Sequence, residues 1–264
     1  MSDKSLIIRM SKLITLMGAS LIASGCALEE DYSLMEINKK PLIIDHFNPE
    51  EDDMDNKEVY EIFLEVYDNA SHNWDRFNEQ FERISSIRIT SEPMELAAKT
   101  IKRKIILSST LDDILIHEMA HVWHFSLRKR ERENFESEWL NKIEPVYNFE
   151  ACRRNKDTSL CNYHTRRSAS VKNYGGANIY EDIATTVQLV YLLTNPHYNL
   201  PGFPNEEPNF RTRTTDTEET PETTITINNV PRVKNKIELL AKYGFISERE
   251  RDYVLRELDN FNEE

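Results

Sequence analysis

The chain has 264 residues, of which 39% are hydrophobic and 30% are charged, and its formal net charge is −13 at pH 7. A protein this acidic is a poor candidate for binding nucleic acid or an anionic lipid surface through its charge, so we expect no nucleic-acid partner. The length is sufficient for one sizeable domain with its own hydrophobic core.

Residues 1–25 have the composition of a secretory signal peptide. Three basic residues precede an apolar run over 13–22, which is too short for a comfortable membrane span, and small residues then lead to Cys26. The segment resembles a bacterial lipoprotein signal peptide, although Ala23 stands where that signal usually has leucine. The resemblance implies that Cys26 is lipidated and anchors the protein in the bacterial cell envelope, and Ala27 in place of aspartate implies the outer membrane. The alternative is a plain secretory signal.

Residues 26–56 are rich in Glu, Asp and Asn, and we interpret them as a tether that contains one strand at 41–45. A single domain is expected over 57–264. Loss of residues 1–25 would change the net charge to −15, so the membrane attachment would depend on the lipid.

Hydrophobic residues recur with helical spacing between Val59 and Ile84, which predicts one or two helices. Alternation over 86–90 predicts a strand, and the apolar run over 102–108 predicts another. We expect these two strands to belong to one small sheet.

The most informative motif follows the second of these strands. His117, Glu118 and His121 form an H-E-x-x-H pattern within a largely apolar segment. Residues four apart lie on the same face of a helix, so both imidazoles can reach one metal ion while Glu118 lies beside its open side. The hydroxyls of residues 108–110 are expected to cap the helix, and acidic residues 112 and 113 suit its first turn.

A strand followed by a buried helix with this motif resembles the zincin metallopeptidases. The resemblance implies an α+β fold, with a small sheet packed on the buried motif helix and a mainly helical C-terminal half. It also implies a catalytic Zn²⁺. His124 lies on the same helix face as His117 but about 10 Å further along the axis, so we expect a structural or rim-lining role for it.

A second helix is predicted from Ile179 onward, with Asn178 as its cap. A catalytic zinc needs three protein ligands, and Glu181 is the best candidate for the third. Asp182 would accept a hydrogen bond from a ligating histidine and orient it. The segment from Tyr174 to Ala184 resembles the glutamate-bearing helix of gluzincin-type peptidases, although Thr185 stands where thermolysin has an acidic residue. Asp182, His164 and Glu150 remain alternative ligands.

A peptidase also needs a donor for the developing oxyanion, and Tyr174 and His164 are the candidates. Cys152 and Cys161 would form a disulfide in an oxidising compartment, or else remain free thiols. A zinc site built from them is less favoured, because the spacing is unlike that of structural zinc sites.

Residues 195–230 are rich in Pro, Thr and Glu and are predicted to be a loop insertion. A helix over 233–243 should end at Gly244, and Ser247 with Glu250 should form a capping box for the last helix.

The predicted function is a zinc-dependent metallopeptidase that hydrolyses peptide or protein substrates at the cell envelope. One alternative is a zinc amidase that acts on cell-wall peptide. Another is a non-catalytic envelope-binding lipoprotein, which the presence of Glu118 disfavours, because a site that only binds metal has no use for this carboxylate.

Overall fold

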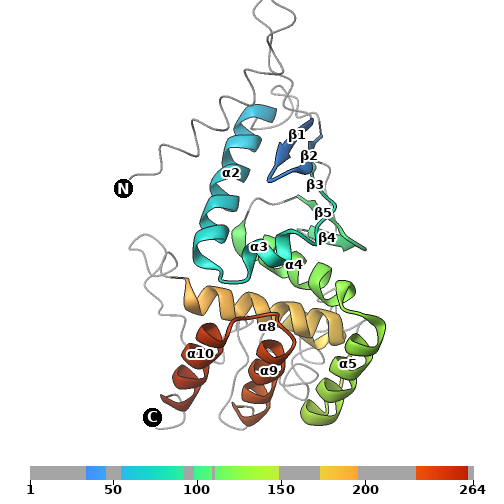
Figure 1. Cartoon of the computed structure of the whole chain (residues 1–264), viewed down its shortest axis with the longest axis vertical. Coiled ribbons are helices and arrows are strands. Elements are labelled where there is room, and N and C mark those ends of the chain that lie inside the picture. Colours follow the sequence, from blue (N-terminus) through green and yellow to red (C-terminus); the bar gives the residue numbers. More distant parts are fainter. Residues whose placement is uncertain are drawn as a thin grey trace, which may run out of the picture. The chain divides into compact units, whose positions relative to one another are not determined.

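The computed structural model describes residues 34–45, 55–91, 98–108, 111–148, 173–195 and 230–260. These residues belong to one compact unit and form a mixed α/β fold with seven α-helices and a five-stranded sheet (Figure 1). The expected combination of a small sheet with a mainly helical C-terminal half is confirmed. None of the described helices is long and apolar enough to span a membrane.

The sheet contains three central parallel strands and two antiparallel edge strands. The strands are β1 (Leu34–Ile37), β2 (Lys40–Ile44), β3 (Ser86–Ile89), β4 (Ala98–Ile101) and β5 (Lys104–Leu107). Their order is β1-β2-β3-β5-β4, so β1 and β4 are the edges. Pairing is parallel between β2, β3 and β5, whereas β1 and β4 run antiparallel to their neighbours. Strands β3 and β5 agree with the two strands predicted from the sequence.

The first two strands differ from the expected tether. The strand predicted at 41–45 is present as β2, but β1 pairs with it through a tight turn at Asn38 and Lys39, so residues 34–44 belong to the sheet. Both turn residues have positive φ, 47° and 63°. Such turns usually carry glycine, which is absent here, and the sequence therefore gave little sign of a hairpin.

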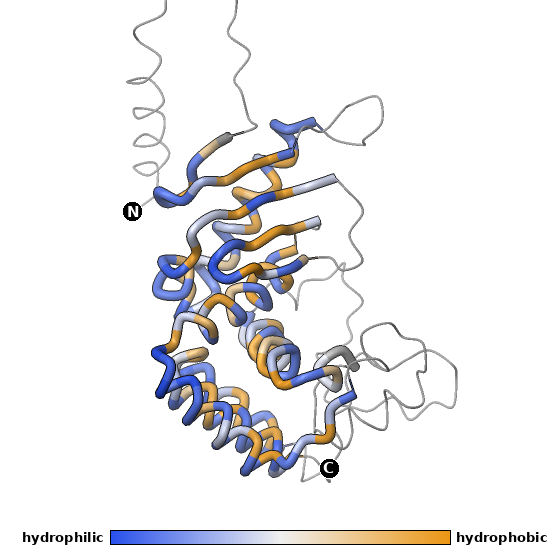
Figure 2. Tube along the Cα trace, turned by 90° about the vertical axis from the view of Figure 1, so that its right-hand side faces the viewer, coloured by the Kyte–Doolittle hydropathy of each residue, from blue (hydrophilic) through white to orange (hydrophobic). Residues whose placement is uncertain are grey.

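Helices from the N-terminal and C-terminal parts of the described chain surround one continuous hydrophobic core. They are α2 (Asn56–Asn73), α3 (Phe77–Phe81), α4 (Asp112–Ser126), α5 (Lys129–Ile143), α8 (Ile179–Thr194), α9 (Val230–Lys242) and α10 (Glu248–Asn260), with a short 3-10 helix η1 (Asn173–Gly176). Figure 2 shows hydrophobic and hydrophilic residues alternating along these elements, as expected when one face of each lies in the core. Helix α8 packs against α4 on one side and against α9 and α10 on the other (Figure 1).

The beginning of α4 differs in detail from the prediction. Its N-cap residue is Leu111, which forms no capping hydrogen bond through its side chain. The carboxylate of Asp112 instead accepts from the backbone N–H of Asp113 at 2.8 Å. The acidic first turn is present as expected, and it stabilises the exposed N–H groups of the helix through its charge.

The last two helices follow the predicted pattern. Gly244 has φ 75° after α9, and a Cβ there would lie 3.2 Å from the ring of Trp123 on α4. Ser247 Oγ accepts from the N–H of Glu250, and the Glu250 carboxylate accepts from the N–H of Ser247, which is a capping box. Trp123 Nε1 on α4 donates to the backbone carbonyl of Tyr243 at 3.1 Å, which connects the segment between the last two helices to the motif helix.

Candidate metal centre

Helix α4 is buried over most of its surface because nearly every residue between its two acidic N-terminal positions and Ser126 is apolar or belongs to the H-E-x-x-H motif. His117 and His121 are 9% and 8% exposed, and their rings lie 4.9 Å apart, edge to face. The spacing of four residues therefore places both imidazoles on one face of the helix, as the sequence predicts.

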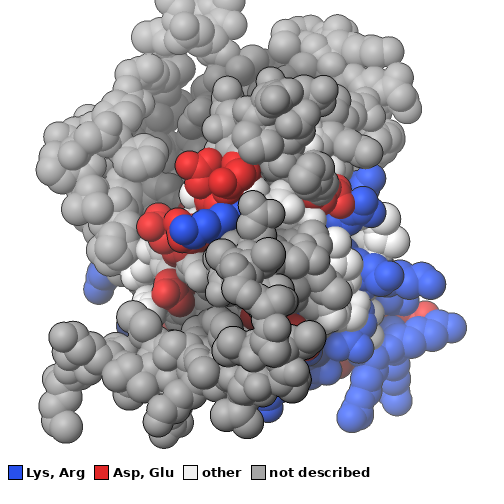
Figure 3. Space-filling model, turned by 90° about the horizontal axis from the view of Figure 1, so that it is seen from above, with Lys and Arg blue, Asp and Glu red and all other residues white. Residues whose placement is uncertain are grey.

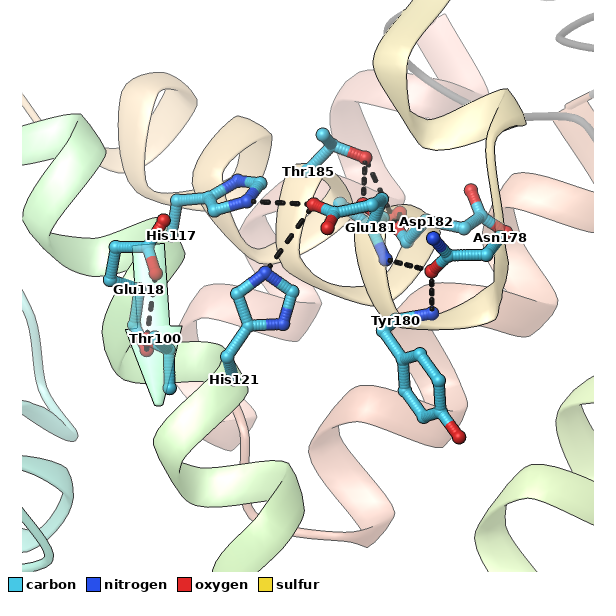
Figure 4. A network of polar contacts seen from close by, with 10 residues as sticks. Thr100, His117, Glu118, His121, Asn178, Tyr180, Glu181, Asp182 and Thr185 are labelled. Carbon is cyan, nitrogen blue, oxygen red and sulfur yellow. Dashed lines mark hydrogen bonds and ion pairs between the residues drawn. The ribbon is translucent and has the colours of Figure 1, made fainter. Parts of the chain in front are cut away.

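Helix α8 supplies the third member of the site. The Asn178 side chain accepts from the backbone N–H groups of Tyr180 and Glu181 at 2.9 and 3.0 Å, and this cap fixes the first turn (Figure 4). Glu181 lies in that turn, and Thr185 donates to its backbone carbonyl at 2.7 Å. Small residues such as Ala184 on this helix allow α4 to approach closely, so the Glu181 carboxylate reaches the two imidazoles.

Three ligand atoms converge at this point. Glu181 Oε2 lies 3.2 Å from His117 Nε2 and 3.4 Å from His121 Nε2 (Figure 4). One ligand atom from each of the three residues lies within 4.8 Å of the others, so the group could hold a metal ion. The structure thus brings together the three residues that the sequence analysis selects as ligands.

The charges in this group stabilise one another. Burial alone would raise the pKa of Glu181, but hydrogen bonds and charge from His117 and His121 outweigh it and hold this pKa far below its usual range. Burial alone would lower the pKa of His121, yet the hydrogen bond and charge of Glu181 raise it. A carboxylate that stays ionised beside two imidazoles matches the chemistry of a cation site.

Glu118 lies next to these ligands and is held by the edge strand of the sheet. It is 5% exposed, and its Oε2 accepts a hydrogen bond from Thr100 Oγ1 on β4 at 2.6 Å (Figure 4). Thr100 was not predicted as a site residue. The residues of β4 lacked a clear strand pattern in the sequence, so nothing there placed the threonine beside the motif.

A cavity of about 380 Å³ contains the site. The cavity is lined by the two histidines, by Glu118 and Glu181, and by residues 98–100 of β4. Phe125 and Tyr180 form an aromatic part of the wall, with their ring centroids 5.5 Å apart. The candidate ligands therefore face an open space that is bordered by an edge strand.

Asp182 does not orient a histidine, in contrast to its predicted role. Its side chain is fully buried on a different side of α8 and lies 2.6 Å from Lys236 Nζ on α9. Its other oxygen accepts from Tyr147 at 2.9 Å and from Trp139 at 3.2 Å. Adjacent residues of a helix point about 100° apart, so Glu181 and Asp182 face different environments. Asp182 instead connects α8 to α5 and α9.

The partner lysine is also fully buried. Lys236 lies in the apolar stripe of α9, and its Nζ is 5.4 Å from the centre of the Trp139 ring. Burial lowers the pKa of Lys236, and the charge of Asp182 opposes this effect. A lysine between Val233 and Ile237, within a hydrophobic stripe of helical spacing, is the sequence signal for this buried pair.

His124 is separate from the metal-binding group. Its side chain is fully buried among aromatic rings, those of Phe125, Phe135 and Tyr180 lying 5.5 to 5.6 Å away. Its Nε2 is 3.1 Å from Glu136 Oε1. Burial lowers the pKa of His124 to about 3, so the ring is neutral near pH 7. These surroundings agree with the structural role predicted for it and place it in the core, not at a rim.

Several predicted residues lie outside the described part of the chain. These are Cys26, Glu150, Cys152, Cys161 and His164, together with the side chain of Tyr174. The lipidation, the disulfide and the choice of oxyanion donor therefore remain predictions. The described cluster favours Glu181 over Asp182 as a ligand, because the Asp182 side chain is engaged with Lys236.

Comparison of the chain with protein-family models, curated proteins and solved structures finds no match. The zincin resemblance thus remains a prediction from the sequence motif.

Replacement of Lys236 by Met should lower the free energy of unfolding by about 3–5 kcal/mol, because Asp182 would be left buried without its counter-charge. Chemical denaturation measures this loss. Lys242→Met is the matched control, since Lys242 lies on the same helix but is exposed and pairs with Glu138 at the surface, and it should change stability little. A loss equal to that of the control would mean that the buried pair is not charged.

The hydrogen bond between Thr100 and Glu118 should couple these residues energetically. A double-mutant cycle with Thr100→Val and Glu118→Ala is expected to give a coupling of about 1.5–3 kcal/mol in unfolding free energy, the range for a bond to a charged group. Thr100→Ser keeps the hydroxyl and should retain most of the coupling. A coupling near zero would show that the threonine does not hold the carboxylate.

Proposed function

We propose that this protein is a zinc-dependent metallopeptidase with a zincin-like fold. The observation that carries the proposal is the convergence of His117, His121 and Glu181 from two helices, with Glu118 in the same cavity. Two imidazoles and one carboxylate are the protein ligand set of several catalytic zinc sites, in which the fourth position is left open.

The two separations between Glu181 and the histidines support a zinc ion as the ligand of this site. Ligand atoms arranged as a tetrahedron at the usual zinc bond lengths of about 2.0–2.1 Å lie about 3.3 Å from one another. The separations of Glu181 Oε2 from the two Nε2 atoms are 3.2 and 3.4 Å. All three ligand atoms lie within 4.8 Å of one another, so one cation could be held between them.

Bound zinc would supply a Lewis acid that polarises a carbonyl group and lowers the pKa of a water molecule. The role of this chain's own residues follows from their positions. The Glu118 carboxylate faces the same cavity as the three ligands, and it would take the proton from the attacking water and hold it for the leaving amine. Thr100 occupies one lone pair of Oε2, which limits rotation of the carboxylate and leaves its other oxygen for this proton.

A peptide is the favoured substrate because an edge strand borders the cavity. Among the described strands β4 pairs only with β5, so an additional strand could pair with its other edge. Residues 98–100 of this strand line the cavity beside Glu118. An extended peptide that pairs with β4 would therefore bring its backbone carbonyls next to the catalytic groups.

The N-terminal segment would determine where this activity is located. On the interpretation of residues 1–25 as a lipoprotein signal, Cys26 would carry the lipid that attaches the domain to the bacterial envelope, and the substrates would be peptides or proteins found there.

Glu118→Gln is expected to lower the rate of peptide hydrolysis by about 10²- to 10⁴-fold, because the amide is not a base, while zinc binding stays at one equivalent. Hydrolysis of a fluorescent casein by the zinc-loaded protein measures the rate, and elemental analysis measures the metal. Glu131→Gln on the exposed surface of α5 is the control and should leave both unchanged.

Two results would contradict the proposal. Hydrolysis by the Glu118→Gln protein at the parent rate would remove this carboxylate from the mechanism. A zinc-loaded parent protein that cleaves no peptide would favour a site that only binds metal.

A further inference from the structure

The β4–β5 hairpin is unusually basic for this acidic chain. Four cations occur within six positions, at Lys99, Lys102, Arg103 and Lys104, although the net charge of the protein is −13. We call these four residues the basic rim. All four are exposed, and among the described residues no carboxylate forms an ion pair with them. Figure 3 shows Lys and Arg side chains gathered on the side of the described surface where β4, β5 and α5 lie in Figure 1.

The basic rim begins on the strand that borders the cavity. Lys99 lines the cavity wall next to Thr100. Lys99 pairs with Ile106 and Lys104 pairs with Ile101, and paired residues point to the same face of a sheet. Since side chains alternate along a strand, Lys99 and Ile101 share that face, so Lys99 and Lys104 do as well. Two ammonium groups therefore stand on the outer face of the edge strand, while Thr100 points toward α4.

The turn of the hairpin is held rigidly. The backbone carbonyl of Arg103 accepts from the N–H of Ser85 at 2.7 Å and from the Ser85 hydroxyl at 3.0 Å. The guanidinium of Arg103 donates to the carbonyl of Arg83. Contacts with the segment before β3 thus fix the position of the neighbouring lysines relative to the cavity.

Lys102 occupies a conformation that a lysine rarely adopts. Its φ is 59°, in the left-handed region that favours glycine. The two-residue turn of this hairpin requires such a φ, as the turn at Lys39 does. Here the side chain adds a third ammonium group at the end of the edge strand.

We propose that the basic rim selects acidic peptide segments as substrates. The inference rests on the proposed peptidase function, since it concerns the same cavity and the same edge strand. A peptide paired with β4 would place alternate side chains on the outer face of the sheet, opposite Lys99, with Lys102 in the adjoining turn and the long side chain of Lys104 on the next strand. Glutamate or aspartate at these positions would neutralise the lysines, whereas lysine or arginine would be repelled.

Local charges decide this preference in spite of the negative charge of the whole chain. At physiological ionic strength, charges further apart than about 8 Å are largely screened, so the lysines beside the bound peptide outweigh distant carboxylates. One direct cross-strand pair with Lys99, at about 0.2–1 kcal/mol, and weaker attraction to Lys102 in the turn and Lys104 on β5 correspond to roughly threefold tighter binding of an acidic peptide than of a neutral one.

The experiment measures peptide binding to the full chain carrying Glu118→Gln, so that the peptide is not consumed. Three fluorescent peptides share one sequence except at alternate positions, which hold Glu, Gln or Lys, and anisotropy gives their dissociation constants. We expect the Glu peptide to bind about threefold more tightly than the Gln peptide, and the Lys peptide to bind more weakly than both. High salt should abolish these differences.

A triple variant, Lys99→Gln with Lys102→Gly and Lys104→Gln, should remove the preference for the Glu peptide. The matched control is Lys39→Gly with Lys57→Gln and Lys142→Gln, which removes the same charge from sites outside the cavity. Lys39 suits this purpose because it also has a positive φ, in the turn at the opposite edge of the sheet. The control variant should keep the preference, and thermal unfolding should show both variants folded.

Equal binding of the three peptides, no measurable binding of any of them, or loss of the preference in the control variant would overturn the inference. The proposed function has a separate test in the same material, since the zinc-loaded parent chain is assayed for cleavage of each peptide. Cleavage of all three peptides without charge preference would support the peptidase function and refute the selection of acidic peptides. Selective binding without cleavage would refute the peptidase and leave a selective peptide-binding surface.

Discussion

The close packing of α4 against α8 is the constraint on which the candidate site depends. The H-E-x-x-H motif places two imidazoles on one face of α4, but this face becomes a three-residue group only because α8 brings Glu181 within 3.2 and 3.4 Å of them. Each of these mostly buried polar groups would lower the free energy of unfolding if it had no partner. Together they compensate one another, since the carboxylate stays ionised and accepts from both rings.

The position of Glu181 depends in turn on contacts along its own helix. The Asn178 cap fixes the beginning of α8, and the buried pair between Asp182 and Lys236 fixes the next residue to α9. The aromatic side chains of Trp139 and Tyr147 complete the surroundings of Asp182. The two neighbouring acidic residues thus have different roles. Glu181 faces the candidate metal centre, and Asp182 connects α8 to α9.

The sequence predicts the parts of this arrangement that depend on local spacing. The two motif histidines, the capped helix that carries Glu181, the central strands β3 and β5, and the helix pair around Gly244 all follow from periodicity or capping patterns. Features that depend on tertiary contacts were missed or misassigned. Thr100 lies on an edge strand with no clear pattern, and β1 follows a turn without glycine. Asp182 was assigned to the wrong environment because sequence adjacency to Glu181 does not show which neighbour each side chain faces.

The central claim is that His117, His121 and Glu181 bind one zinc ion, and zinc titration of the purified protein tests it most directly. The account predicts one equivalent of tightly bound zinc in the parent, strong loss of affinity in Glu181→Ala, and unchanged binding in His164→Ala and in the exposed control His72→Ala. Absence of zinc binding in the parent after remetallation, or full binding in Glu181→Ala, would contradict it.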